Sequence, residues 1–246
     1  MSRSIWAFTA FSFLMPVFLF FYIYGFEQNQ HGASEFIRMF MIYGSLVCAV
    51  YNALFTGRSI TDRTVKNMVV TGARKTSVYL AEVLTSLLFT LSSFLIYTGI
   101  TLILFKNYGR NEILYSASAV VLWLLFFSAF YVLINTYFSS KIFAVFLSMV
   151  FVFVLICLGA SMESMLDEPV NTVSLIDGVE VSQKNPRYIS GVKRDICSFL
   201  LDSNPYTLME DIPVKSELIK TAELTLPLTF ITVLGGTIFF GRKELD

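Results

Sequence analysis

The charged residues that could bind a partner are concentrated in one polar stretch, residues 57–82. The charged side chains that precede Glu82 in this stretch are Arg58, Asp62, Arg63, Lys66, Arg74 and Lys75. Val65, Met68 and Val69 fall at positions i, i+3 and i+4, which predicts one apolar stripe on a charged helix. Thr61 can cap this helix with Asp62 in its first turn, and Gly72 can end it. The pattern indicates a short amphipathic helix that contacts a partner.

Groups that could perform catalysis are scarce in the sequence. It contains no Gly-x-x-x-x-Gly-Lys-Ser/Thr phosphate loop, so we expect no ATP hydrolysis by this chain. The single histidine, His31, cannot build a zinc site or serve a catalytic serine, which excludes six-span serine proteases and metalloproteases. Cys48, Cys157 and Cys197 are predicted to be packing residues. We therefore expect no enzyme activity, no cofactor and no metal site in this chain.

The elements that position the polar stretch are predicted to be membrane-spanning helices. Hydrophobic residues make up 55% of the 246 residues, and 25 residues are Phe. Several apolar runs exceed the roughly 18 residues that mark a spanning helix. The predicted spans are residues 5–26, 36–55, 77–105, 113–138, 142–160 and 218–240. The fold class is an all-α polytopic membrane protein, and its zero net charge gives no basic surface for nucleic acid.

The distribution of basic residues predicts the orientation. An even number of spans puts both termini on one side, and that side carries Arg3, Lys141, Arg242, Lys243 and the basic stretch. The positive-inside rule places this side in the cytoplasm. The predicted parts are residues 1–160 with five transmembrane helices and the cytoplasmic loop 57–76, an extracytoplasmic segment 161–217, and residues 218–246 with the sixth helix and a cytoplasmic tail.

The extracytoplasmic segment is predicted to be a small α+β unit. Strands at 172–176 and 179–183 flank Asp177-Gly178, a pair that suits a type I′ turn. Ser190 can cap a helix that runs to about Leu201 before Pro205. Acids outnumber bases in this segment. It is either a solvated acidic surface or a lid over an exit path.

Ionisable residues inside the spans would mark a proton or ion path. Arg38 and Lys220 are predicted to lie at the outer ends of spans, where their side chains reach the interface. Glu82 is predicted to lie inside the third span, either as a structural acid or as the partner of a basic residue near a hinge. The sequence therefore indicates no coupling to an ion gradient, and active transport would need an external source of energy.

Two motifs frame this arrangement at its cytoplasmic side. Asp62-Arg63-Thr64, Asn67-Met68 and the run Gly-Ala-Arg-Lys-Thr at 72–76 precede the third span, and Gly-Arg-Lys-Glu-Leu at 241–245 follows the sixth. With six spans and cytoplasmic ends, this pattern resembles the membrane subunits of ABC-2-type ABC transporters over essentially the whole chain. Members commonly begin with a cytoplasmic interfacial helix, whereas only residues 1–4 precede the first span here.

The resemblance implies that the short helix docks in a groove of a separate ATP-binding subunit. The contact residues it implies are Asp62, Arg63, Val65, Lys66, Met68, Val69, Gly72 and Arg74. Val65, Met68 and Val69 would fill the groove. Two ATP-binding subunits with ATP and magnesium would drive two six-span halves, formed by a homodimer or by a similar chain. The resemblance implies an exporter in the membrane, and we expect the bacterial cytoplasmic membrane.

The uncharged, Phe-rich spans suggest a hydrophobic or amphipathic cargo, such as an antimicrobial peptide, a lipid or a drug. Two alternatives belong to other classes. One is a membrane scaffold or assembly protein that transports nothing. The other is a passive channel, which the absence of a line of polar residues along any one span disfavours.

Overall fold

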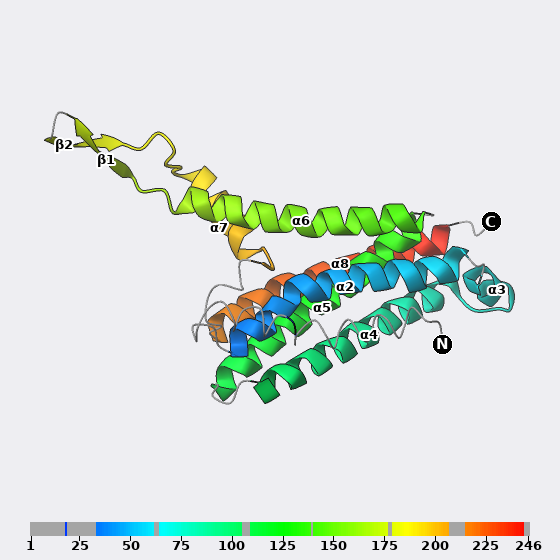
Figure 1. Ribbon diagram of the computed structural model, residues 1–246. Coiled ribbons are helices and arrows are strands. Elements are labelled where there is room, and N and C mark those ends of the chain that lie inside the picture. Colours follow the sequence, from blue (N-terminus) through cyan, green and yellow to red (C-terminus); the bar gives the residue numbers. More distant parts are fainter. Residues whose placement is uncertain are drawn as a thin grey trace. The chain divides into compact units, whose positions relative to one another are not determined.

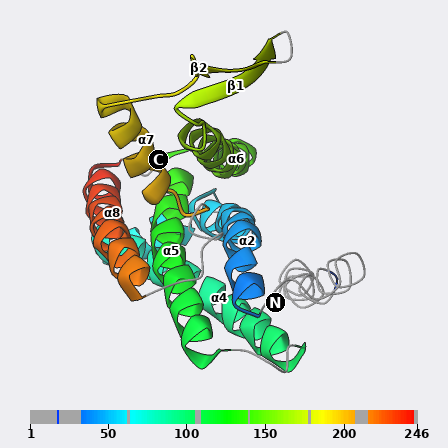
Figure 2. The ribbon, with the colours of Figure 1, turned by 90° about the vertical axis from the view of Figure 1, so that its left-hand side faces the viewer.

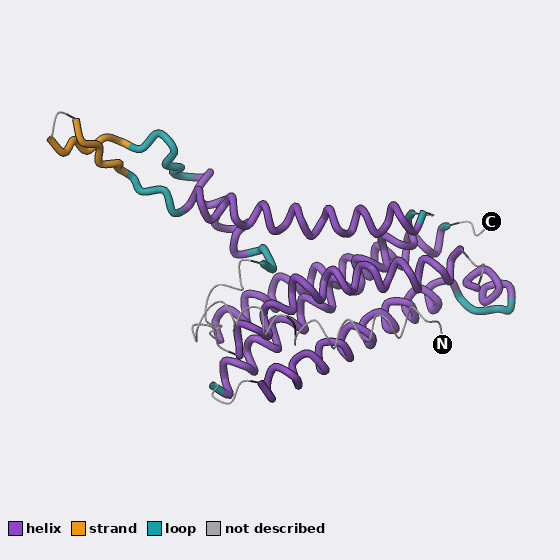
Figure 3. Tube along the Cα trace, viewed as in Figure 1, coloured by secondary structure: helices purple, strands orange, loops and turns teal. Residues whose placement is uncertain are grey.

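The computed structural model describes Phe18 and residues 33–61, 64–104, 109–138, 140–176, 179–206 and 215–243. Most of the described chain is helical, with two short strands (Figure 3). The predicted first span lies outside the described residues except for Phe18. The chain forms two compact units, one of Met1–Val152 with Met209–Asp246 and the other of Phe153–Leu208.

In the described part of the chain, five helices are long and apolar enough to cross a membrane. They are α2 (Ala33–Thr61), α4 (Lys75–Leu104), α5 (Arg110–Tyr137), α6 (Lys141–Leu166) and α8 (Lys215–Arg242). These helices match the last five predicted spans. The helix α5 ends one residue before the predicted end at Phe138, and α6 continues six residues beyond the predicted end at Ala160. The chain is therefore a helical, multi-pass membrane protein.

In the larger unit, α5 is the central helix. It packs against α2, α4 and α8, and Figure 2 shows it between α2 and α8. Its inward face is aromatic, with Trp123, Phe127 and Tyr131 each no more than 3% exposed. The rings of Phe127 and Tyr131 stack at 5.7 Å, which adds to the apolar area that holds the helices together.

The helix α4 turns polar residues inward and apolar residues outward. The outward residues are Leu80, Leu84, Leu88, Leu95 and Ile103, and all are exposed. The buried polar residues are Ser86, Thr90, Ser93, Tyr97 and Thr101. This is the pattern expected where lipid, and not water, surrounds the bundle. The expectation that no span carries a line of polar residues is wrong for α4.

The smaller unit contains a strand pair and a short helix. β1 (Asn171–Ile176) and β2 (Val179–Lys184) are antiparallel, with Ile176 opposite Val179 (Figure 1). The Asp177-Gly178 turn itself lies outside the described residues. The helix α7 (Val192–Asp202) begins after Gly191, whose φ is 62°. The expected cap by Ser190 is wrong, because Gly191 takes the cap position in a conformation that favours glycine and makes no side-chain cap.

Candidate functional site

The predicted short helix is α3 (Thr64–Val70), and Gly72 lies in the turn that stops it, as expected. The Gly72 N–H donates to the Val69 carbonyl and the Ala73 N–H donates to the Met68 carbonyl, both at 3.0 Å. These two bonds form a Schellman motif, and Gly72 occupies its left-handed position with φ of 103°. The helix starts at Thr64 and not directly after Thr61, because α2 extends to Thr61. Asp62 and Arg63 lie outside the described residues.

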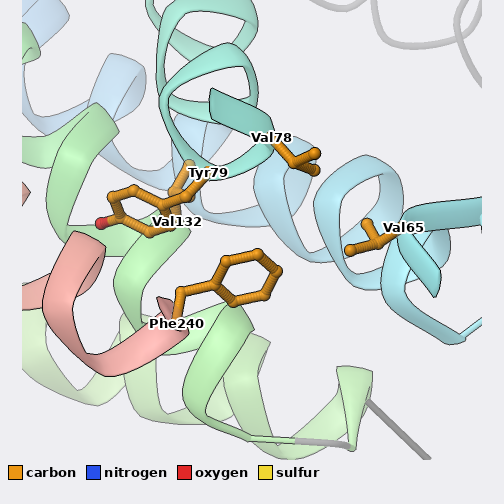
Figure 4. Close-up of a cluster of buried hydrophobic side chains, with 5 residues drawn as sticks. All are labelled: Val65, Val78, Tyr79, Val132 and Phe240. Atoms are coloured by element: carbon orange, nitrogen blue, oxygen red, sulfur yellow. The ribbon is translucent and has the colours of Figure 1, made fainter. Parts of the chain in front are cut away.

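The side chain of Val65 fixes α3 to its own chain. It is 2% exposed and belongs to a cluster of five buried side chains from four helices (Figure 4). The other members are Val78 and Tyr79 of α4, Val132 of α5 and Phe240 of α8. Burying a valine in this way contributes about 1.5–3 kcal/mol. Val65 is thus buried within its own chain, where α3 packs against α2 and α4, whereas the resemblance implied that it fills a partner's groove.

The three apolar side chains of the α3 stripe therefore lie in two different environments, one buried and one exposed. Val69 is half-buried and packs against the same cluster, whereas Met68 is 47% exposed. Because successive residues of a helix turn by about 100°, Val69 lies about 40° to one side of Val65 and Met68 about 60° to the other. The exposed part of α3 and its loop comprises Asn67, Met68, Val70, Thr71, Gly72, Ala73 and Arg74, and Lys66 is half-buried.

Met68 borders a groove of about 490 Å³ between α3 and the adjoining ends of α2 and α4. Tyr51 and Phe55 of α2 contribute aromatic rings, and the Tyr51 ring stacks on Phe89 at 3.6 Å. Glu82 of α4 is half-buried and lines the same groove. The structure thus places Glu82 beside Met68, at the end of α4 that follows the basic loop.

Two lysines join the ends of three helices near α3. The Lys75 ammonium donates to the Lys243 carbonyl at 2.7 Å, and the Lys243 ammonium donates to the Thr136 carbonyl at 2.6 Å. Both acceptors lie at the carboxyl ends of helices, where a positive charge is favourable. Burial lowers the pKa of Lys243 below its ordinary value. Figure 1 shows α3 and the last turn of α8 at the same end of the bundle.

A buried polar cluster lies further along the same helices, and sequence reasoning missed it. Its members are Cys48 and Asn52 of α2, Ser86 and Thr90 of α4, and Ser128 of α5, each no more than 1% exposed. The Asn52 amide donates to the Ser86 hydroxyl at 2.8 Å, and the Thr90 hydroxyl oxygen lies within hydrogen-bond distance of the Cys48 sulfur, at 3.3 Å. Cys48 is thus a packing residue, as predicted, but it packs among polar groups.

The cluster had a signal in the sequence. Cys48 and Asn52 are four residues apart, and Glu82, Ser86 and Thr90 repeat the same spacing, which places each set on one helix face. The prediction considered only charged residues inside the spans, and the Asn, Ser and Thr residues of this cluster carry no charge. The hydroxyl and amide groups bind other protein groups, so they hold α2, α4 and α5 together.

Two other expectations concerned single residues near the outer ends of spans. Arg38 was expected at the interface, but it is 6% exposed. Its neighbours Ile37 and Met41 are 0% and 3% exposed, because α2 packs against α4 and α5 along this part of its length. Lys220 is exposed, as expected. Cys157 is exposed on α6, so it does not pack in a core, and Cys197 is half-buried.

Among the described residues, no group of three or more His, Cys, Asp and Glu side chains could hold a metal ion. Comparison of the chain with known proteins finds no matching family model, no matching curated protein and no matching solved structure. The interpretation of the site therefore depends on its geometry and on the residues themselves.

Proposed function

We propose that this chain is the membrane-spanning subunit of an ATP-driven exporter of the ABC-2 type. The observation that supports the proposal is that one side of α3 is buried against its own chain while another side is exposed. Val65 is buried in a cluster with side chains of α4, α5 and α8, while Met68 and Val70 stay 47% and 77% exposed at the same end of the bundle. A helix that is fixed to its own chain and open to a partner can transmit a push from that partner to the long helices.

The partner in this proposal is a separate ATP-binding subunit, present in two copies with ATP and magnesium. It contacts Met68, Val70 and the loop with Gly72 and Arg74, and Arg63 and Lys66 lie at the rim of the contact. Val65 and Val69 hold the helix in place. The basic residues Arg74, Lys75 and Arg242 near this end support a cytoplasmic location under the positive-inside rule.

The remaining parts of the proposal follow from the exporter class. A second copy or a similar chain supplies the other half of the transport path in a bacterial cytoplasmic membrane. Two bound ATPases then rock the two halves between inward-facing and outward-facing states. The apolar outward faces of α4, α6 and α8 favour a hydrophobic or amphipathic cargo that reaches the protein from the bilayer, such as a peptide, a lipid or a drug.

Co-purification with an ATP-binding subunit encoded beside this chain tests the proposal. Met68→Asp places a charge in the apolar contact, and Arg63→Glu reverses a charge at its rim, so each abolishes the complex and leaves the chain in the membrane. Asn111→Asp is the control, because Asn111 is exposed at the far end of α5. A complex that survives both substitutions rejects the docking role. If the unaltered chain binds no ATPase, a scaffold without transport is favoured.

A further inference from the structure

The helix α7 is amphipathic, and the described residues leave its apolar face uncovered. None of its residues is buried. Its exposed apolar side chains are Val192 at 73%, Ile196 at 53%, Phe199 at 64% and Leu200 at 42%. They fall at i, i+4, i+7 and i+8, which makes one stripe along the helix. Charged residues border the stripe, with Lys193 on one side and Asp195 and Asp202 on the other.

The opposite side of α7 is tied to the last turns of α6. The Arg194 guanidinium donates to the Leu166 carbonyl at 3.0 Å, at the carboxyl end of α6. Just beyond α7, the Asn204 amide donates to the Leu155 carbonyl at 2.6 Å. The stretch of α6 between these two acceptors is about 16 Å long at 1.5 Å per residue, close to the length of α7 itself. These two bonds hold the α7 segment beside this part of α6.

The part of α6 beside α7 has its own exposed apolar surface. Phe153 is 67% exposed, and Val154 and Leu158 are each 43% exposed. Further along, α6 becomes polar at Glu163 and ends at Leu166. Because α6 is one of the helices that can span the membrane, its exposed apolar residues face lipid. The two bonds thus place the α7 segment beside the part of α6 in which this apolar surface gives way to polar residues.

We propose that α7 is a lipid-binding helix that lies at the edge of the bilayer. Its four apolar side chains insert among the acyl chains, while Lys193 reaches the lipid phosphates. The charged borders suit this position, because a helix at the interface keeps its flanking charges at the level of the head groups. The bonds to α6 fix its depth. This role does not depend on an ATPase partner or on transport.

Site-directed spin labelling in vesicles of phosphatidylethanolamine and phosphatidylglycerol tests the proposal. The background carries Cys157→Ser and Cys197→Ser and keeps Cys48, which is fully buried and inaccessible to the label. Labels are placed at Ile196→Cys in the middle of the stripe and at Asp195→Cys on its border, two neighbouring positions about 100° apart around the helix. Oxygen, which concentrates in lipid, and a water-soluble nickel chelate then report the surroundings of each label.

The expected result is a label at position 196 that oxygen relaxes several times more strongly than the chelate does, with the reverse at position 195. Equal, strong relaxation of both labels by the chelate overturns the proposal, because the stripe would then face water. Dipolar broadening at position 196 also overturns it, because a second copy of the chain would then cover the stripe. Each reading uses the full chain without an ATPase, so it is independent of the exporter proposal.

Discussion

The amide of Asn52 donates a hydrogen bond to the hydroxyl of Ser86 across the contact between α2 and α4, at 2.8 Å. The same amide also donates to the Cys48 carbonyl one turn earlier in α2, at 2.8 Å. Both amide hydrogens therefore have acceptors in a place where each member of the cluster is almost completely buried. The Asn52 side chain thus forms one hydrogen bond within its own helix, α2, and one to the neighbouring helix, α4.

Replacing Asn52 with Leu should lower the stability of the bundle. Leu has a similar size but no donor, so Ser86 loses its partner across the helix contact. Hydrogen bonds between membrane helices contribute about 0.6–1.7 kcal/mol, which corresponds to a fall of about 1–7 °C in the melting temperature for a chain of this size. Thermal unfolding in detergent micelles measures the change. Ser92→Ala is the control, since the exposed Ser92 hydroxyl bonds only within α4. Equal melting temperatures for the two variants would contradict the role of Asn52.

The neighbouring glycines Gly235 and Gly236 of α8 should differ sharply when each is changed to Ala. A Cβ at Gly236 would lie 1.9 Å from the Tyr79 hydroxyl oxygen, whereas a Cβ at Gly235 meets nothing within 4 Å. Gly236→Ala should therefore force Tyr79 and α4 to shift, at a cost of about 1–3 kcal/mol. Gly235→Ala should be neutral or stabilising by up to about 1 kcal/mol, because Ala favours helix. The melting temperatures of the two variants measure the difference. A Gly236→Ala variant that is as stable as the unaltered chain would show that α4 and α8 are not in close contact there.

Changing Gly72 to Ala should weaken the end of α3 through backbone strain alone. No atom lies within 4 Å of the added Cβ, but the φ of 103° is unfavourable for any residue with a side chain. The expected cost is about 1–2 kcal/mol. Gly99→Ala is the matched control, because Gly99 also has open space around it but lies inside the helix α4. Protease cleavage after the loop lysine and arginine residues should accelerate in Gly72→Ala and not in Gly99→Ala.

Under the proposed function, Val65→Ala should separate ATP hydrolysis from transport. Removing two methyl groups from the buried cluster costs about 1.5 kcal/mol. This loosens α3 from α4, α5 and α8 without touching its exposed face. ATPase binding and ATP hydrolysis should persist while export falls several-fold. Val170→Ala removes the same groups from a side chain that is 51% exposed in the segment between α6 and β1, away from the proposed contact, and it is the matched control.

Measurements of hydrolysis and of cargo export in the same proteoliposomes provide the test. A proportional loss of both activities in Val65→Ala would show that Val65 contributes only to assembly. Equal behaviour of the two variants would show that the buried cluster has no part in transmission.

Local pattern predicted the long helices well, because spans and caps depend on nearby residues. The spans from the second to the sixth each match one long helix to within a few residues, and the stop at Gly72 follows from a position that only glycine occupies without strain. The strand pair around residues 177–178 is equally local. The count of six spans remains a prediction, because the predicted first span lies outside the described residues except for Phe18.

The environment of each helix face could not be read from the same pattern. Val65 and Met68 belong to one stripe in the sequence. Of these two side chains, however, only Val65 is buried in the cluster with residues of α4, α5 and α8. Arg38 lies near the start of a span in sequence, but neighbouring helices bury it. Such outcomes depend on which helices meet in three dimensions, and the spacing of residues along one helix does not contain that information.

The hydroxyls of α4 and α8 have a consequence for how the protein is made. Thr90, Thr225 and Thr229 each donate to the carbonyl four residues earlier in their own helix, at 2.7–2.8 Å. Each hydroxyl thus has its acceptor within its own helix. The free-energy cost of placing the hydroxyl in hydrocarbon is therefore largely offset before another helix packs against it. The insertion machinery can therefore release these helices into the bilayer one at a time, and their assembly into a bundle can follow.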